Sequence, residues 1–160
     1  MESTVMETAR AYRVPRYQVQ LVREGSLATS YPRFSNSKLI SDWLRPMALS
    51  CDRENFWVLT LDSKNRLIGM HTVSTGSASM SIVHPREVAK TAILQNAAAI
   101  VCLHNHPSGD PAPSREDREV TERLQRVMRD LGVRFLDHII IGEADYFSFA
   151  DAGYLATMAQ

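Results

Sequence analysis

The chain has 160 residues, of which 44% are hydrophobic and 22% charged, and this predicts one globular domain with a sizeable core. Its formal net charge is zero, which argues against a strongly basic nucleic-acid surface, although residues 1–50 carry seven basic against four acidic side chains. No apolar run reaches membrane-spanning length and the first residues lack the features of a signal peptide, so we expect a cytoplasmic protein with no membrane partner.

The first fifty residues predict an arm, a short strand and a helix. Residues 1–14 lack a core pattern, and we expect them to form a flexible N-terminal arm. In residues 17–22 apolar side chains alternate with glutamines, and this period of two indicates a half-buried strand. Residues 35–37 offer N-caps for a helix that Pro46 helps to end.

Residues 55–62 and 66–74 predict a β-hairpin. Both runs are rich in apolar and β-branched residues, and turn-forming residues separate them. Glu54 stands directly before the first of these strands. Taken alone, it is best interpreted as an exposed acid at a strand end.

Pro85 begins a predicted helix that leads into a buried strand. Proline suits the first helical turn, and Glu87 suits the positive end of the helix dipole. The run 97–103 is short, apolar and followed by turn residues, which predicts a buried strand. Cys102 lies in this run and is expected in the core, although its closeness to His104 makes it a minor candidate ligand.

Two histidines follow this strand one residue apart. His104 and His106 project to the same side of an extended segment, so both imidazoles can face one point. After a loop rich in proline, an apolar stripe at helical spacing begins at Ser114 and places Asp117 in the first turn. Two histidines and a carboxylate form an expected zinc set. Ser114 and Asp117 equally fit a capping box, and the two interpretations are compatible.

Residues 135–142 predict a further strand, and the aromatic tail predicts a segment that docks on the sheet. Asp137 and His138 fall on opposite faces of this strand. Either one is a candidate for a partner that orients a metal ligand, and a purely structural role is an equal alternative. The order of strands and helices predicts an α/β fold, with a single mixed sheet and flanking helices.

The ordered pattern His-x-His-x7-Ser-x2-Asp resembles the metal motif of the JAMM (MPN, or Mov34) metallopeptidase superfamily. Within that superfamily, this chain resembles the RadC family in four stretches: IVHPREV, NAAAI, HNHPSGDPAPSREDREVTERL and LDHIIIG. This resemblance implies a RadC-like JAMM/MPN domain over residues 15–160, with cytidine-deaminase-like layering. Its lead-in strand and helix would occupy residues 15–50, and its metal-site core residues 51–160.

The resemblance also implies a zinc hydrolase. His104, His106 and Asp117 would hold the zinc ion. Glu54 matches the family's glutamate before the early strand and would be the general base, while Ser114 would donate a hydrogen bond to the developing oxyanion. The implied reaction is cleavage of a peptide or isopeptide bond, with a protein or peptide as substrate.

Two other functions stay open at this point. The family's traditional repair label suggests a DNA-associated protein, but longer members carry an upstream helix-hairpin-helix region for which these 160 residues leave no room. Some MPN relatives are catalytically silent scaffolds for protein interaction, and the complete ligand set argues against that alternative.

Overall fold

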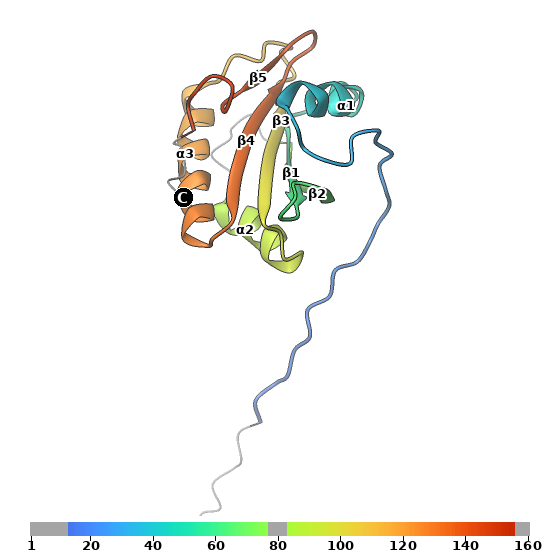
Figure 1. Ribbon diagram of the computed structural model, residues 1–160, viewed down its shortest axis with the longest axis vertical. Helices are drawn as coiled ribbons and strands as arrows, with labels where there is room; N and C mark the ends of the chain where they lie inside the picture. The colour runs from blue at the N-terminus through green and yellow to red at the C-terminus, as the bar shows by residue number, and fades with distance from the viewer. Residues whose placement is uncertain (1–12, 77–82, 156–160) are drawn as a thin grey trace, which may run out of the picture.

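A mixed sheet lies between helices in the computed structural model, which describes residues 13–76 and 83–155 (Figure 1). Within these residues the sheet has five strands, in the order β2-β1-β3-β4-β5. The strands are β1 (Asn55–Leu61), β2 (Leu67–Thr75), β3 (Ala99–Asn105), β4 (Arg134–Ile141) and β5 (Tyr146–Ser148). The helices are α1 (Ser37–Leu49), α2 (Pro85–Leu94) and α3 (Arg115–Asp130). The predicted α/β class with a single mixed sheet is confirmed.

The central strand β3 receives its neighbours in two different ways. β1 pairs with β3 in antiparallel register, and the hairpin partner β2 extends the sheet beyond β1. β4 runs parallel to β3, which requires a crossover, and α3 supplies it. In this register His104 lies opposite Phe56 on one side and Ile140 on the other. The end of β3 is therefore enclosed by its neighbours.

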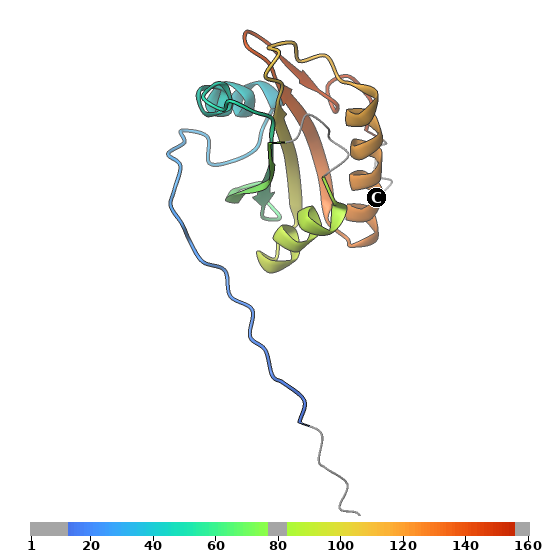
Figure 2. The ribbon, with the colours of Figure 1, turned by 180° about the vertical axis from the view of Figure 1, so that it is seen from behind.

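Apolar side chains fill both faces of the sheet. Helices α2 and α3 cover one face and pack with Ile100 and Cys102 of β3. Helix α1 covers the other face and packs with Val101 and Leu103. In both Figure 1 and Figure 2, α1 and α3 lie on opposite sides of the sheet. All seven residues of β3 are buried, because successive side chains enter the two cores in turn.

The predicted strand over residues 17–22 is wrong. These residues form no regular secondary structure, and Tyr17 is 88% exposed. Alternating apolar residues favour a strand only where a neighbouring strand completes its hydrogen bonds. The segment first meets the sheet at Pro32, whose carbonyl accepts from the Leu67 N–H of β2 at 2.9 Å, and the next residue, Arg33, bridges to Arg66. Residues 1–12 of the predicted arm lie outside the described residues.

Helix α1 begins as predicted but continues past its proline. Asn36 is the N-cap, and its side chain accepts a hydrogen bond from the Leu39 N–H at 2.9 Å. Pro46 lies inside the helix, which ends at Leu49 rather than at the proline. A proline near the C-terminal end removes only one helical donor, so the last turn still forms. None of the helices in the described ranges is both long and apolar enough to cross a membrane.

Candidate metal centre

The C-terminal end of β3 places two imidazoles beside each other. His104 is the penultimate residue of the strand and is fully buried. His106 follows directly after the strand, and its backbone N–H donates to the Ile141 carbonyl of β4 at 3.1 Å. The two side chains therefore project in the same direction, and their Nε2 atoms are 3.0 Å apart.

The first turn of α3 brings the carboxylate of Asp117 to these imidazoles. Ser114 is the N-cap and forms the predicted capping box with Asp117, so this interpretation is confirmed. Asp117 Oδ1 lies 3.3 Å from His104 Nε2, and Oδ2 lies 3.5 Å from His106 Nε2. One ligand atom from each of these three residues falls within 4.8 Å of the others. The structure thus brings the three predicted metal ligands together.

The buried oxygen Oδ1 of Asp117 lacks a hydrogen-bond donor among the described residues. Oδ2, in contrast, accepts from both the backbone N–H and the hydroxyl of Ser114, each at 2.7 Å. A buried acceptor without a donor is costly in free energy. A cation among these atoms would complete the set, so the donor atoms fit a metal ion.

His106 is held in the form that a metal ion requires. Its Nδ1 lies 2.7 Å from the main-chain carbonyl oxygen of Asp110. A carbonyl oxygen can only accept, so Nδ1 carries the hydrogen and the neutral ring presents an unprotonated Nε2 to the cluster. Asp117, and the Asp110 carbonyl less strongly, raise the pKa of His106 against the opposing effect of burial. A proton on this Nε2 is therefore the competitor of a metal ion.

The carboxylate of Asp117 is anionic in this setting. Burial acts to raise its pKa, but the neighbouring imidazoles of His104 and His106 outweigh burial and hold the pKa far below its usual range. Burial lowers the pKa of His104 despite its contact with Asp117. The site therefore combines a negative carboxylate with a neutral buried imidazole, a combination that favours a divalent cation.

Glu54 lies beside this cluster without belonging to it. It is half-buried at the entrance to β1, and its pKa is raised, chiefly by burial, with the negative charge of Asp117 adding to the effect and His106 opposing it. The alternative Glu87 lies in the first turn of α2 and pairs with Lys90, which supports the structural interpretation of that acid. Of the two glutamates, only Glu54 is coupled to the cluster.

Asn105 was missed by the sequence interpretation, although it stands between the two histidines. Its side chain points away from theirs and clamps the chain on both sides of Glu54. Oδ1 accepts from the Asn55 N–H at 2.7 Å, and Nδ2 donates to the Arg53 carbonyl at 3.1 Å. The alternation of a strand was the available signal, because the middle residue of His-x-His must face the opposite side.

The two candidates on β4 have different roles. His138 is buried, and its Nε2 lies 2.8 Å from His104 Nδ1. Asp137 instead accepts hydrogen bonds from the Ser148 hydroxyl at 2.6 Å and from the Ala150 N–H at 2.9 Å. Of the pair, His138 contacts a candidate ligand, and Asp137 ties β4 to the segment around β5.

Cys102 does not join the metal cluster, so its interpretation as a minor candidate ligand is not supported. The thiol is fully buried in the core beneath α2 and α3, and burial raises its pKa, which keeps it protonated. Ser114 is engaged as a cap: its hydroxyl accepts from the Asp117 N–H at 3.1 Å and donates to Asp117 Oδ2. A hydrogen bond from Ser114 to a substrate oxygen would require that hydroxyl to turn.

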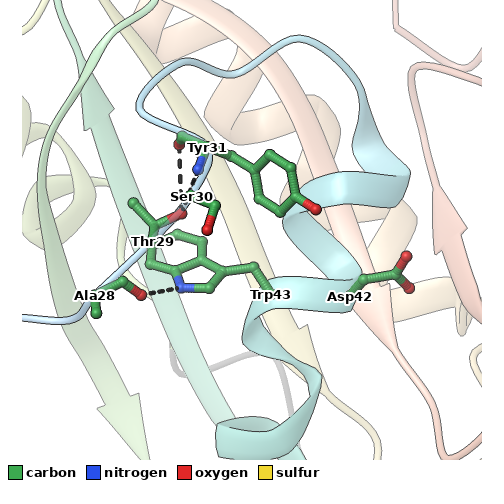
Figure 3. A pocket seen from close by; sticks show the side chains of 6 residues that line it. All are labelled: Ala28, Thr29, Ser30, Tyr31, Asp42 and Trp43. Carbon is green, nitrogen blue, oxygen red and sulfur yellow. Dashed lines mark hydrogen bonds between the residues drawn. The ribbon is translucent and has the colours of Figure 1, made fainter.

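A separate hollow lies where residues 28–31 pass beside α1 (Figure 3). Trp43 lines it and donates from its indole Nε1 to the Ala28 carbonyl at 2.8 Å. Asp42 is the only acid among its lining residues, and no predicted site residue lines it. This hollow is therefore separate from the cluster at the end of β3.

Comparison with known proteins finds one family over most of this chain. The profile of the RadC-like JAB domain matches residues 34–154. A UPF0758 protein of Pelobacter propionicus is 46% identical over 132 residues, which cover 82% of this chain and 58% of the relative. A UPF0758 protein of Trichlorobacter lovleyi is 49% identical over 123 residues, or 77% of this chain and 54% of the relative. The chain spans about half the length of the curated relatives it matches.

Proposed function

This chain belongs to the RadC-like JAB domain family, and from that membership we propose that it is a zinc-dependent hydrolase of peptide or isopeptide bonds. One observation carries the proposal. Within the part of the chain that the structure describes, Asp117 Oδ1 is buried without a donor and faces the Nε2 atom of His104 at 3.3 Å, while His106 completes the cluster. Such an arrangement is unfavourable unless a cation joins it.

The donor set suits zinc in a catalytic role. Two imidazole nitrogens and one carboxylate oxygen provide three protein ligands, which leaves one tetrahedral position for a reacting group. His106 is part-exposed, with 16% of its side chain accessible, whereas His104 and Asp117 are fully buried. A substrate would therefore approach from the His106 side of the site.

Zinc held in this site would supply Lewis acidity, which polarises a carbonyl group and acidifies a nearby water molecule. Glu54 would take the proton from that water and later return it to the leaving amine. Its raised pKa and half-buried position suit a group that both accepts and donates a proton. Asn105 would keep Glu54 in place by holding the backbone on both sides of it.

The proposal is tested with zinc-loaded protein and a panel of peptides and isopeptide-linked peptides. Glu54→Gln is expected to bind zinc like the wild type. Its hydrolysis rate is expected to fall about 10²- to 10⁴-fold, because that is the usual contribution of general-base catalysis. Glu87→Gln is the matched control, since this glutamate lies on α2 and pairs with Lys90. Full activity of Glu54→Gln would remove Glu54 from the mechanism.

A zinc-loaded wild type that cleaves none of the panel would contradict the hydrolase proposal and favour the scaffold alternative. The DNA-associated alternative remains a prediction. It requires DNA affinity that falls steeply as the salt concentration rises.

A further inference from the structure

A buried chain of hydrogen bonds runs behind His104, on the side away from the metal cluster. His104 Nδ1 lies 2.8 Å from His138 Nε2, and the other nitrogen of His138 lies 2.6 Å from the hydroxyl of Thr121. That hydroxyl in turn lies 2.6 Å from the main-chain carbonyl oxygen of Asp117. All four residues are buried, and they join β3, β4 and α3.

The carbonyl at one end determines the direction of every hydrogen bond in the chain. A carbonyl oxygen can only accept, so the Thr121 hydroxyl donates to Asp117. The same hydroxyl has no second hydrogen, so it accepts from His138 Nδ1–H. A neutral His138 then has an unprotonated Nε2, which accepts from His104 Nδ1–H. His104 is left with an unprotonated Nε2, which lies 3.0 Å from the equally unprotonated Nε2 of His106. Two acceptors at this distance are unfavourable unless a cation lies between them.

His138 is neutral because of what surrounds it. Its ring stacks on Phe149 at 5.1 Å between centroids and meets Phe56 edge-on at 5.4 Å. The ring is fully buried, and its two nitrogens contact an imidazole and a hydroxyl. No carboxylate of the described residues is hydrogen-bonded to either nitrogen, so a second proton would leave a buried charge without a partner. The ring therefore has a hydrogen on only one of its two nitrogens, as the chain of hydrogen bonds requires.

We propose that Thr121 and His138 are positioning residues that lock His104 in the Nδ1–H tautomer and thereby raise the affinity of the site for zinc. The opposite tautomer would place a hydrogen on His104 Nε2, where it would block the ion. This inference rests on the zinc site of the proposed function and does not depend on hydrolysis.

Removal of the Thr121 hydroxyl tests the lock. Thr121→Val keeps the shape of the side chain but leaves His138 Nδ1–H without its acceptor in a buried position. The other tautomer of His138, which donates from Nε2 to His104 Nδ1, then becomes competitive and moves the His104 hydrogen to Nε2. Thr121→Ser keeps the hydroxyl and serves as the matched control.

Zinc affinity is measured by competition with a chromophoric chelator. We expect Thr121→Val to bind zinc about 10 to 100-fold more weakly than the wild type, the usual effect of losing a partner that orients a metal-binding histidine. Thr121→Ser is expected to bind like the wild type. Equal affinity of Thr121→Val and the wild type would overturn the inference, as would equal weakening by both substitutions.

A second readout needs neither zinc nor activity. Long-range ¹H–¹⁵N spectra of the metal-free protein report which nitrogen of each histidine carries the hydrogen. The wild type is expected to show His104 and His138 both protonated at Nδ1, and Thr121→Val to show a shift of His104 toward Nε2–H. A wild-type His104 protonated at Nε2 would overturn the inference even if Thr121→Val failed to fold.

These readouts separate the inference from the proposed function. Protein that binds zinc, shows the expected tautomers and cleaves no peptide would refute the hydrolase proposal alone. Protein that cleaves peptides with His104 protonated at Nε2 in the metal-free state would refute the tautomer lock alone.

Discussion

Asp117 and Asp137 are both buried carboxylates, yet their partners differ in kind. Asp137 accepts from one hydroxyl and two backbone N–H groups, those of His138 and Ala150, so both of its oxygens are satisfied. Asp117 satisfies only Oδ2 in this way, and Oδ1 faces imidazole nitrogen. Burial raises the pKa of Asp137 to about 6, whereas the imidazoles lower that of Asp117.

This difference separates a structural acid from a functional one. Neutral donors satisfy the carboxylate oxygens of Asp137, so its role is structural: it holds β4 to the segment around β5. Asp117 keeps a charge and an open acceptor in a place where protein donors are absent from the described residues. A buried acceptor without a donor is a sign of a binding site when two further candidate ligands lie beside it, as His104 and His106 do here.

The largest effect that separates the two carboxylates is the response to zinc. Free zinc at about a thousand times its Kd stabilises a protein by about 4 kcal/mol. We expect the wild type and Asp137→Asn to show this rise in calorimetric melting, and Asp117→Asn to show none. A zinc response that survives in Asp117→Asn would mean that the ion binds elsewhere.

The second effect is the pH dependence of stability. The pKa of Asp137 rises from an ordinary 3.8 to about 6 on folding, so the folded state binds the proton more tightly. The stabilisation of the folded state by this bound proton is therefore fully present below about pH 4 and is lost as the pH rises through 6. It amounts to about 3 kcal/mol, since one pKa unit is worth about 1.4 kcal/mol.

Urea unfolding of the wild type and Asp137→Asn from pH 4 to 7 measures this effect, because the difference between them cancels the other titrating groups. We expect the asparagine variant to gain stability relative to the wild type by about 3 kcal/mol over this range. A difference that does not change with pH would show that the carboxyl of Asp137 titrates normally.

A smaller effect follows from the donor on each carboxylate. Ser148→Ala removes the hydroxyl that donates to Asp137 Oδ2 and leaves this oxygen without a donor among the described residues. The expected loss is about 1 to 3 kcal/mol, the cost of an unsatisfied buried acceptor. Chemical denaturation at a pH above 7, where Asp137 is ionised, measures it. Stability unchanged from the wild type would show that water replaces the hydroxyl.

Ser114→Ala is the counterpart on Asp117 and should cost less. The backbone N–H at position 114 continues to donate to Asp117 Oδ2, so only the hydroxyl of the cap is lost. The expected loss is about 1 kcal/mol in the metal-free protein, the usual value of an N-cap. A larger loss of stability than for Ser148→Ala would contradict the expectation that Asp117 depends less than Asp137 on its hydroxyl donor.

Sequence patterns predicted most of the fold because its elements have strong local signals. The apolar run of β3, the hairpin of β1 and β2 and the capped start of α3 were all found in this way. The same rule failed at residues 17–22, since alternation alone does not supply a partner strand. Pro46 also failed to end α1, because its place in the last turn costs only one donor.

The candidate site was predictable in part for the same physical reason. His104, His106 and Asp117 lie close together in sequence, so a short motif describes them. Thr121 acts through a contact between elements that are distant in the sequence, and no local pattern marks it. Strand alternation could have placed Asn105 on the side away from the two histidines, but its partners on either side of Glu54 are distant in the sequence. His138 was predictable in part: its strand and its candidacy as a partner of a metal ligand were predicted, but its contact with His104 was not.

The central claim is that the cluster of His104, His106 and Asp117 is a zinc site. The most direct test is elemental analysis of the full chain after loading with zinc and removal of the excess, with His106→Ala as the comparison. We predict about one zinc ion per wild-type chain and none in the variant. A wild type without zinc, or a variant that retains it, would contradict the account.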